Sequence, residues 1–352
     1  IQGNLIGVDA SGIMGLGNQW GIGCWSSARQ NTIIGNVVSA NEEGIHFNGC
    51  TDNYVADNFI GTDATGSLDL GNLHQGVHLF GGASDHQIGP DNHIAHNGST
   101  GIDVSNETSL YNTITQNSLH DNGWAIGLYG GGNAETPPPT LIYASPQIVT
   151  GTTTVPSATI ELFASEERWE ARIYKATTVA DASGVFTFTG LTGIQDLFLT
   201  ATGTDPQGNT SGLSDYVSTS PPVGLDLHAP AVGLTDTLYP LVASVRYTTA
   251  RPLTYTWQAT GQPPVTHANR EDLADTISFA WPTPGRQTVN VIVSNPFGAI
   301  TATHTLTIAE AGSAPDVIFE ESGLSLPGAY AGAAEWGDYD ADGDLDILLT
   351  GY

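Results

Sequence analysis

The sequence predicts an all-β protein, in which a parallel β-helix is followed by two β-sandwiches and a short acidic hairpin. Three observations support this prediction. A glycine–apolar pair recurs through residues 1–133 at intervals of 23 to 32 residues, short alternating runs separated by turn signals follow it, and aspartates crowd the C-terminal segment. With 43 Gly and 19 Pro among 352 residues, the composition favours strands and turns over helices.

Glycine followed by an apolar residue marks each repeat of residues 1–133. Successive pairs lie 23, 32, 25 and 24 residues apart, and alanine replaces glycine in the last. A period in this range is typical of a solenoid, in which each repeat buries its apolar face against its neighbours. The pairs are Gly21-Ile22, Gly44-Ile45, Gly76-Val77, Gly101-Ile102 and Ala125-Ile126.

Alternate residues after each glycine are apolar, which predicts strands that stack in register. A second pattern, Asn-x-apolar-x-x-Asn, begins at Asn31, Asn53, Asn92 and Asn112. Asparagine tolerates left-handed turns, and its amide can bond to the coils above and below. We therefore align these four segments as one asparagine ladder. A ladder of this kind favours a parallel β-helix over a leucine-rich repeat.

A longer echo supports the coil prediction, because residues 4–12 match residues 58–66 at a constant offset of 54. With these repeats, residues 1–133 resemble the bacterial right-handed parallel β-helix family of the pectate-lyase-like superfamily. The resemblance covers about the first third of the chain and implies a right-handed coil. Within this region, Asp9 and Asp63 each precede a glycine by three residues and are expected to form turns.

Short alternating runs after Pro137 predict small β-sandwiches. The segment 201–211 resembles the closing hairpin of bacterial surface Ig-like domains. The run 289–298 resembles the end of a PKD-type Ig-like domain, although residues 257–261 lack that family's usual Gly-Asp-Gly turn. Trp257 and Trp281 are expected in the core. The predicted domains are 1–133 (β-helix, about five coils), 137–220 (Ig-like), 222–310 (PKD-type) and 315–352 (partial FG-GAP/VCBS repeat).

The acidic C-terminal motif has carboxylates at the first, third, fifth, seventh and ninth positions and glycine at the sixth. This spacing wraps oxygen ligands around a hard cation, so we expect Ca²⁺ as the cofactor. The motif resembles the calcium loops of FG-GAP/VCBS repeats, and residues 347–349 would form the following strand of a truncated hairpin. The expected metal residues are Asp338, Asp340, Asp342, Asp344 and Asp346.

Stacking also predicts an outward strip on the β-helix. The residues two positions after each glycine include His46, His78 and Asp103, which would form one exposed row. The family resemblance implies that carbohydrate-active enzymes place their sites on such a strip, and His46, His78 and Asp103 are therefore the catalytic candidates. Only one carboxylate and no Lys or Arg stand in this row, which argues against catalysis. The expected ligand-binding residues are Trp25, His46, Phe80 and Tyr129.

Other candidate sites are weaker. Cys24 and Cys50 fall in different columns and are expected to be small core residues rather than a disulfide. Four further histidines of the β-helix region are expected in turns, with no spacing suited to zinc or copper. These are His74, His86, His93 and His96.

Charge and hydropathy limit the partners. Only 8 Lys and Arg oppose 36 Asp and Glu, which gives a formal net charge of −28. A chain so poor in cations is not expected to bind nucleic acid. No segment is long and apolar enough to insert into a membrane. A polysaccharide or cell-surface glycan is the expected partner, and end-to-end self-association of a β-helix cut within a coil is a further expectation.

These features predict a fragment of a secreted or cell-surface bacterial protein that acts extracellularly in adhesion, glycan recognition or scaffolding, without catalysis. A polysaccharide-active β-helix enzyme (a lyase, hydrolase or epimerase) with Ig-like accessory domains is the alternative. A purely architectural spacer is the third hypothesis.

Overall fold

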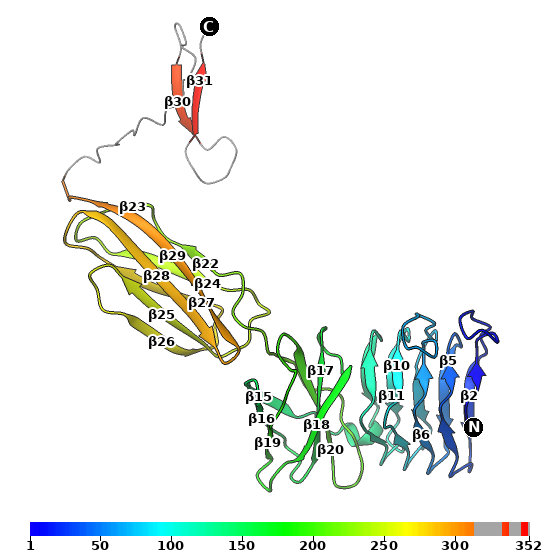
Figure 1. The fold of residues 1–352 in the computed structure, drawn as a ribbon. Coiled ribbons are helices and arrows are strands. Elements are labelled where there is room, and N and C mark those ends of the chain that lie inside the picture. The colour runs from blue at the N-terminus through cyan, green and yellow to red at the C-terminus, as the bar shows by residue number, and fades with distance from the viewer. Residues whose placement is uncertain (313–332, 338–345, 351–352) are drawn as a thin grey trace.

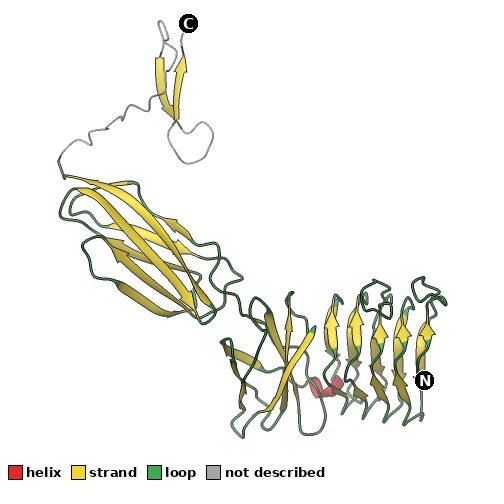
Figure 2. Ribbon diagram, viewed as in Figure 1, coloured by secondary structure: helices red, strands yellow, loops and turns green. Residues whose placement is uncertain are grey.

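The structure is a computed structural model that describes residues 1–312, 333–337 and 346–350. Apart from one short 3-10 turn, η1 (Gly132–Glu135), every regular element in these ranges is a β-strand, as the colouring of Figure 2 shows. Within the same ranges, no helix has the length and apolar character needed to cross a membrane. The prediction of an all-β protein is confirmed.

Residues 1–133 wind into stacked coils whose strands form three parallel sheets (Figure 1). The first sheet consists of β2 (Trp20–Trp25), β5 (Glu43–Asn48), β8 (Val77–Phe80), β11 (Thr100–Ser105) and β14 (Trp124–Tyr129). The second consists of β3 (Thr32–Ile34), β6 (Tyr54–Ala56), β9 (Gln87–Ile88) and β12 (Thr113–Ile114). The third consists of β1 (Leu5–Ile6), β4 (Val37–Val38), β7 (Phe59–Ile60), β10 (His93–Ala95) and β13 (Ser118–His120). The predicted parallel β-helix is confirmed.

The first apolar residue of each repeat lies directly above its counterpart in the next coil. This column forms the centre of a continuous core that runs along the β-helix. Ile45, Val77 and Ile102 are fully buried in it, and each such side chain contributes about 2 kcal/mol through the removal of apolar surface from water. The column consists of Ile22, Ile45, Val77, Ile102 and Ile126.

The glycine before each of the first four of these residues is required by the close approach of the next coil. A Cβ atom at Gly44 would lie 2.3 Å from the carbonyl oxygen of Gly76, and one at Gly76 would lie 2.7 Å from that of Gly101. Both distances are far below a normal contact, so a side chain at either position would force two coils apart. The glycine–apolar pair is therefore a consequence of stacking, one pair per coil.

Three ladders of polar side chains, rather than the single ladder that we predicted, follow the turns between the sheets. In each ladder a side-chain oxygen or nitrogen accepts a hydrogen bond from the backbone N–H of the neighbouring coil. The first ladder contains Asn18, Asn41, Asn72, Asn97 and Asn122. The second contains Asn31, Asn53, His86, Asn112 and Asn133. The third contains Asn4, Asn36, Asn58, Asn92 and Asn117.

Our alignment of Asn92 and Asn97 was therefore wrong. Asn92 stands in the ladder of Asn58, and its coil places His86 beside Asn53 instead. The strand register agrees, because Ile88 pairs with Val55. His86 lies in a turn, as expected, but it also takes a place in a ladder, which we did not predict. The sequence pattern misled us because asparagine follows His86 after six residues, whereas in the other coils the spacing is five.

His86 is a buried member of its ladder. Its Nδ1 accepts the backbone N–H of Asn53 at 3.1 Å, and its ring stacks on Phe47 with centroids 4.5 Å apart. Since Nδ1 is an acceptor, the proton of the neutral ring is on Nε2, for which the described residues offer no partner. Burial lowers the pKa of His86 from 6.5 to about 4.

We predict that His86 makes the fold sensitive to acid. The unfolded chain binds a proton at His86 near pH 6.5, whereas the folded state resists protonation until about pH 4. The free energy of unfolding should therefore fall by up to about 3 kcal/mol between these pH values because of this group alone. In His86→Asn, which keeps an acceptor for Asn53, denaturant titrations should show a smaller loss. The exposed His74→Asn serves as the control, and an identical loss in His86→Asn would contradict the prediction.

Two sheets follow the β-helix and enclose a second core. One consists of β15 (Thr140–Ala144), β16 (Ile148–Thr152) and β19 (Val185–Thr189). The other consists of β17 (Thr159–Ser165), β18 (Ile173–Val179), β20 (Phe198–Thr204) and β21 (Val217–Ser218). Phe163 and Ala171 belong to the core of the β-helix, so this unit covers its last coil.

A third core lies between two further sheets, and it contains Trp257 and Trp281 as predicted. The Trp257 indole donates to the Asp275 carboxylate at 2.8 Å. One sheet consists of β22 (Asp226–His228), β24 (Tyr239–Ser244) and β27 (Ala274–Phe279). The other consists of β23 (Val232–Leu234), β25 (Leu253–Ala259), β26 (Val265–Arg270), β28 (Gly285–Asn295) and β29 (Gly298–Ala309).

The last described element is an antiparallel pair of strands, β30 (Ala333–Gly337) and β31 (Asp346–Thr350). The strand predicted at residues 347–349 is thus present. Asp338, Asp340, Asp342 and Asp344 lie outside the described residues, and Asp346 is the first residue of β31.

Candidate functional site

The outward strip of the first sheet has the register that the repeats predict. His46 of β5 pairs with His78 of β8, which in turn pairs with Asp103 of β11. Gly23 and Gly127 occupy the same column at its two ends. Three neighbouring coils therefore bring two imidazoles and a carboxylate side by side.

The strip is recessed, so our expectation of an exposed row was wrong. His46 is only 8% exposed and Asp103 only 5%, and His78 is partly buried. The indoles of Trp20 and Trp25 cause this burial at one end, because their centroids lie 5.6 and 5.9 Å from that of His46. The two indoles also contact each other edge to face at 5.2 Å.

A second carboxylate, Glu43, lies in the same recess, although the sequence predicted only one. Its Oε2 lies 2.6 Å from Nδ1 of His46 and 3.3 Å from Nδ1 of His78. Strict alternation would direct Glu43 to the same face as the inward Ile45. At Gly44, however, a Cβ atom would approach Ile60 in the core, so Gly44 and the buried Ile45 both face inward. This break in alternation turns Glu43 toward His46.

The ionisation of these groups follows from their neighbours. Hydrogen bonds from His46, and then from His78, lower the pKa of Glu43 to about 2. Because an ionised carboxylate can only accept, the imidazole N–H groups at Nδ1 of His46 and His78 donate to Glu43. Burial raises the pKa of Asp103, opposed chiefly by the hydrogen bond from the Ser105 hydroxyl.

Glu43, His46 and His78 form a set of possible metal ligands. One donor atom from each lies within 4.8 Å of the other two. Around a tetrahedral zinc ion, with bonds of about 2.0 Å, two ligand atoms are about 3.3 Å apart, so side-chain shifts of an ångström or so would close the set. Two imidazoles and one carboxylate suit zinc or copper(II), whereas calcium takes oxygen ligands. The residues present therefore fit a transition-metal ion.

Exposed aromatic side chains surround the recess. Trp25 is 44% exposed, Phe80 40% and Tyr129 48%. Trp25 and Tyr129 each fold back over a glycine of the strip, since a Cβ at Gly23 would lie 2.0 Å from the Trp25 ring and one at Gly127 would lie 2.5 Å from the Tyr129 ring. The predicted ligand residues Trp25, Phe80 and Tyr129 thus share one face with the buried His46.

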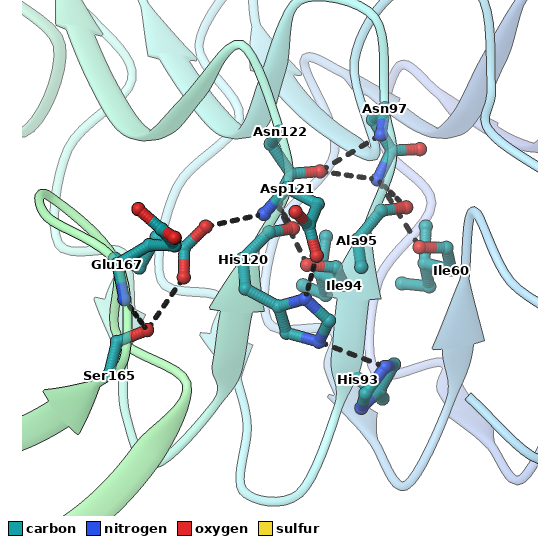
Figure 3. A network of polar contacts seen from close by, with 11 residues as sticks. Ile60, His93, Ile94, Ala95, Asn97, His120, Asp121, Asn122, Ser165 and Glu167 are labelled. Atoms are coloured by element: carbon teal, nitrogen blue, oxygen red, sulfur yellow. Dashed lines mark hydrogen bonds and ion pairs between the residues drawn. The ribbon is translucent and has the colours of Figure 1, made fainter. Parts of the chain in front are cut away.

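A second imidazole pair lies on the third sheet (Figure 3). His93 is in β10 rather than in a turn, contrary to expectation, and its Nε2 lies 3.1 Å from Nε2 of His120. Asp121 contacts Nδ1 of His120 at 2.7 Å. Burial lowers the pKa of His93, which favours its neutral ring, and the two imidazoles share one hydrogen bond between their Nε2 atoms. We interpret this pair as a hydrogen-bonded connection between two coils.

The cysteines and the two loop aspartates have the structural roles that the sequence predicts. Cys24 and Cys50 are free and buried. Asp63 accepts the Thr65 hydroxyl and the backbone N–H groups of Ser67 and Leu68, which closes its loop. Asp9 makes the equivalent bonds in the first coil.

The solved structures that are similar to this chain include three distant ones. A two-domain fibronectin type-III segment of chicken tenascin has 13% identity and a TM-score of 0.19, with 49% of this chain and 99% of that one covered. The BSP domain of a biofilm-associated protein has 13% identity and a TM-score of 0.19, with 50% and 30% covered. The receptor tyrosine kinase Torso has 8% identity and a TM-score of 0.22, with 48% and 72% covered. TM-scores this low support no inference.

Comparison of the sequence with curated proteins finds no match. One family profile matches, and it covers residues 17–136, which include both the metal-ligand set and its aromatic surround. That family is described as periplasmic copper-binding protein (NosD). The β-helix of this chain, about a third of its length, is therefore similar to the NosD family.

Proposed function

We propose that this chain is part of an extracytoplasmic bacterial protein whose β-helix binds a transition-metal ion through Glu43, His46 and His78. The observation that carries the proposal is the convergence of these three donors in one recess. The recess is acidic, because Glu43 and Asp103 both border it and His78 is the group that separates them. A bound divalent cation would neutralise the negative charge of these two carboxylates.

The metal site would be open to a further ligand. Three protein ligands leave a fourth position for water or a bound group, as in catalytic rather than structural zinc sites. Asp103, whose Oδ1 lies 4.0 Å from Nε2 of His78, would orient that imidazole. The similarity to a family named for periplasmic copper binding supports copper as the ion and a location in the periplasm, in the medium or on the cell surface.

We predict that the full chain binds one equivalent of copper(II) through this set, with zinc weaker, in line with the general affinity order of divalent ions. Calorimetric titration should give this stoichiometry, and the electron paramagnetic resonance spectrum of the copper complex should show nitrogen coordination. His46→Ala with His78→Ala should weaken binding at least about 100-fold, since two of three ligands are lost. The exposed His74→Ala is the control. Unchanged affinity and an unchanged spectrum in the double variant would refute the assignment.

A second function, recognition of a glycan in adhesion or scaffolding without catalysis, is favoured by the exposed aromatic side chains around the recess. Trp25, Phe80 and Tyr129 offer apolar faces on which sugar rings can stack, and His46 lies beneath Trp25.

The competing hypothesis is a polysaccharide lyase, hydrolase or epimerase. Glu43 supports it, because Glu43 adds a second carboxylate to the recess. Among the described residues, however, no Lys or Arg forms an ion pair with Glu43 or Asp103.

We predict that a polysaccharide retained by the chain is lost in Trp25→Ala and in Gly23→Ala, because the added methyl group displaces the Trp25 ring. Affinity should fall about tenfold in each variant. Gly212→Ala, where a Cβ meets only an ordinary contact 3.5 Å away, is the control. Release of unsaturated products from a polyuronate, abolished in both His46→Ala and His78→Ala, would establish the enzymatic alternative instead.

The remaining chain is proposed to act as a spacer that follows this β-helix. In this proposal residues 1–133 are the β-helix, 137–220 an Ig-like domain, 222–310 a PKD-type Ig-like domain and 315–352 a partial FG-GAP/VCBS repeat. The paired sheets around the second and third cores support the two middle assignments. The Asp-x-Asp-x-Asp-Gly spacing of residues 338–346 supports the last and implies Ca²⁺.

We predict that millimolar Ca²⁺ protects the C-terminal segment, because bound cation removes the repulsion among its carboxylates. Limited proteolysis should slow after Ala311 when Ca²⁺ is added, and Asp340→Ala should abolish the effect. The exposed Asp226→Ala should retain it. Equal cleavage with and without Ca²⁺ in the unaltered chain would refute a calcium loop.

A further inference from the structure

A cleft of about 560 Å³ lies where the last coil of the β-helix meets the following unit. Its walls come from both parts of the chain. The β-helix contributes the segment from β13 to β14, and the following unit contributes the loop between β17 and β18. The side chains that concern us are Asp121, Trp124, Arg168, Trp169, Glu170 and Asp215.

Direct bonds fix the two walls of the cleft relative to each other. The backbones of Leu119 and Ala171 exchange two hydrogen bonds of 2.9 Å. The Glu170 carboxylate accepts the backbone N–H of Asp121 at 2.9 Å and the Ser165 hydroxyl at 2.6 Å. Figure 3 shows this polar network beside His120 and Asp121. The cleft is therefore pre-formed, which lowers the entropic cost of binding.

Two exposed indoles line the cleft, one from each wall. Trp124 is 67% exposed and Trp169 54%. Trp169 has φ = 57°, a left-handed conformation that is rare for a bulky residue and is concentrated at binding sites. Its ring meets Tyr216 edge to face at 5.1 Å, which holds it in place. A large apolar surface is thus presented to solvent in a strained but supported geometry.

Carboxylates stand beside these indoles. Asp121, Glu170 and Asp215 supply hydrogen-bond acceptors, while the Arg168 guanidinium lies 4.6 Å from the Tyr247 ring centroid and is held by aromatic faces. A purely apolar ligand would leave these carboxylates desolvated, and an acidic ligand would be repelled by them. A sugar ring satisfies both requirements, because its C–H face stacks on an indole and its hydroxyls donate to carboxylates.

We propose that this cleft binds a sugar unit without a carboxylate, within a neutral or amino-bearing polysaccharide. The site is separate from the metal-ligand set and shares no residue with it, so either assignment can fail without the other. It is also distinct from the face that carries Trp25.

The test is calorimetric titration of the full chain with three tetrasaccharides: cellotetraose, the tetramer of glucosamine and tetragalacturonate. Saturable binding of the first or second is expected, with none of the third. Trp124→Ala and Trp169→Ala should each weaken that binding by about tenfold or more. Both side chains are exposed, so the melting temperature should not change. Leu238→Ala, at a 68% exposed side chain outside the cleft and outside the face that carries Trp25, is the control and should bind as the unaltered chain does.

Each contrary result overturns the proposal. Absence of binding by both non-acidic tetrasaccharides up to about 10 mM would do so, since a pre-formed site should reach millimolar affinity. Equal binding in Trp124→Ala and Trp169→Ala would place the sugar elsewhere. Binding of tetramethylammonium without either sugar would make the cleft a cation site.

Discussion

The close stacking of one coil on the next is the constraint on which the rest of the structure depends. It requires a residue without a Cβ before the inward column of each coil that another coil follows, because Gly44 and Gly76 approach the carbonyl oxygens of the next coil. It also requires that the backbone N–H groups at the turns find partners, which the three polar ladders supply. Unpaired groups in these buried turns would be costly, so the ladders stabilise the fold alongside the apolar column.

Stacking also creates the candidate site. Residues 35 positions apart, Glu43 and His78, come within hydrogen-bond distance because successive coils place equivalent positions beside each other. The site thus needs no loop of its own. Its donors lie on strands whose inward neighbours Phe47 and Leu79 are fully buried, which fixes their spacing. The recess exists because Trp20 and Trp25 rise above it at one end.

The junction with the second unit shows how the last coil is completed. Glu161, 4% exposed, accepts the Thr115 hydroxyl at 2.6 Å and the Gln116 backbone N–H at 3.0 Å. Burial raises the pKa of Glu161, and these two bonds oppose the shift. The following sheet therefore satisfies backbone groups that a further coil would otherwise satisfy. The same junction forms the cleft between Trp124 and Trp169, so the covering of the coil and the proposed sugar site have one structural origin.

The sequence alone determined the parallel β-helix, the inward column from Ile22 to Ile126 and the outward column from Gly23 to Gly127. Period and alternation specify these, because each follows from a single repeating geometry. It also determined that Cys24 and Trp257 are buried, because each lies among alternating apolar residues of a predicted strand.

Only the tertiary structure decided what breaks the repeat. Glu43 faces His46 because Gly44 and Ile45 both face inward, and His86 takes an asparagine's place in a segment one residue longer than its counterparts. The burial of His46 depends on indoles whose direction no periodicity specifies. The junction cleft joins Asp121 to Glu170, 49 positions further along the chain, through a pairing that is not repeated in the coils of the β-helix. Local pattern predicts what every coil shares, whereas contacts made once depend on the packing of the whole chain.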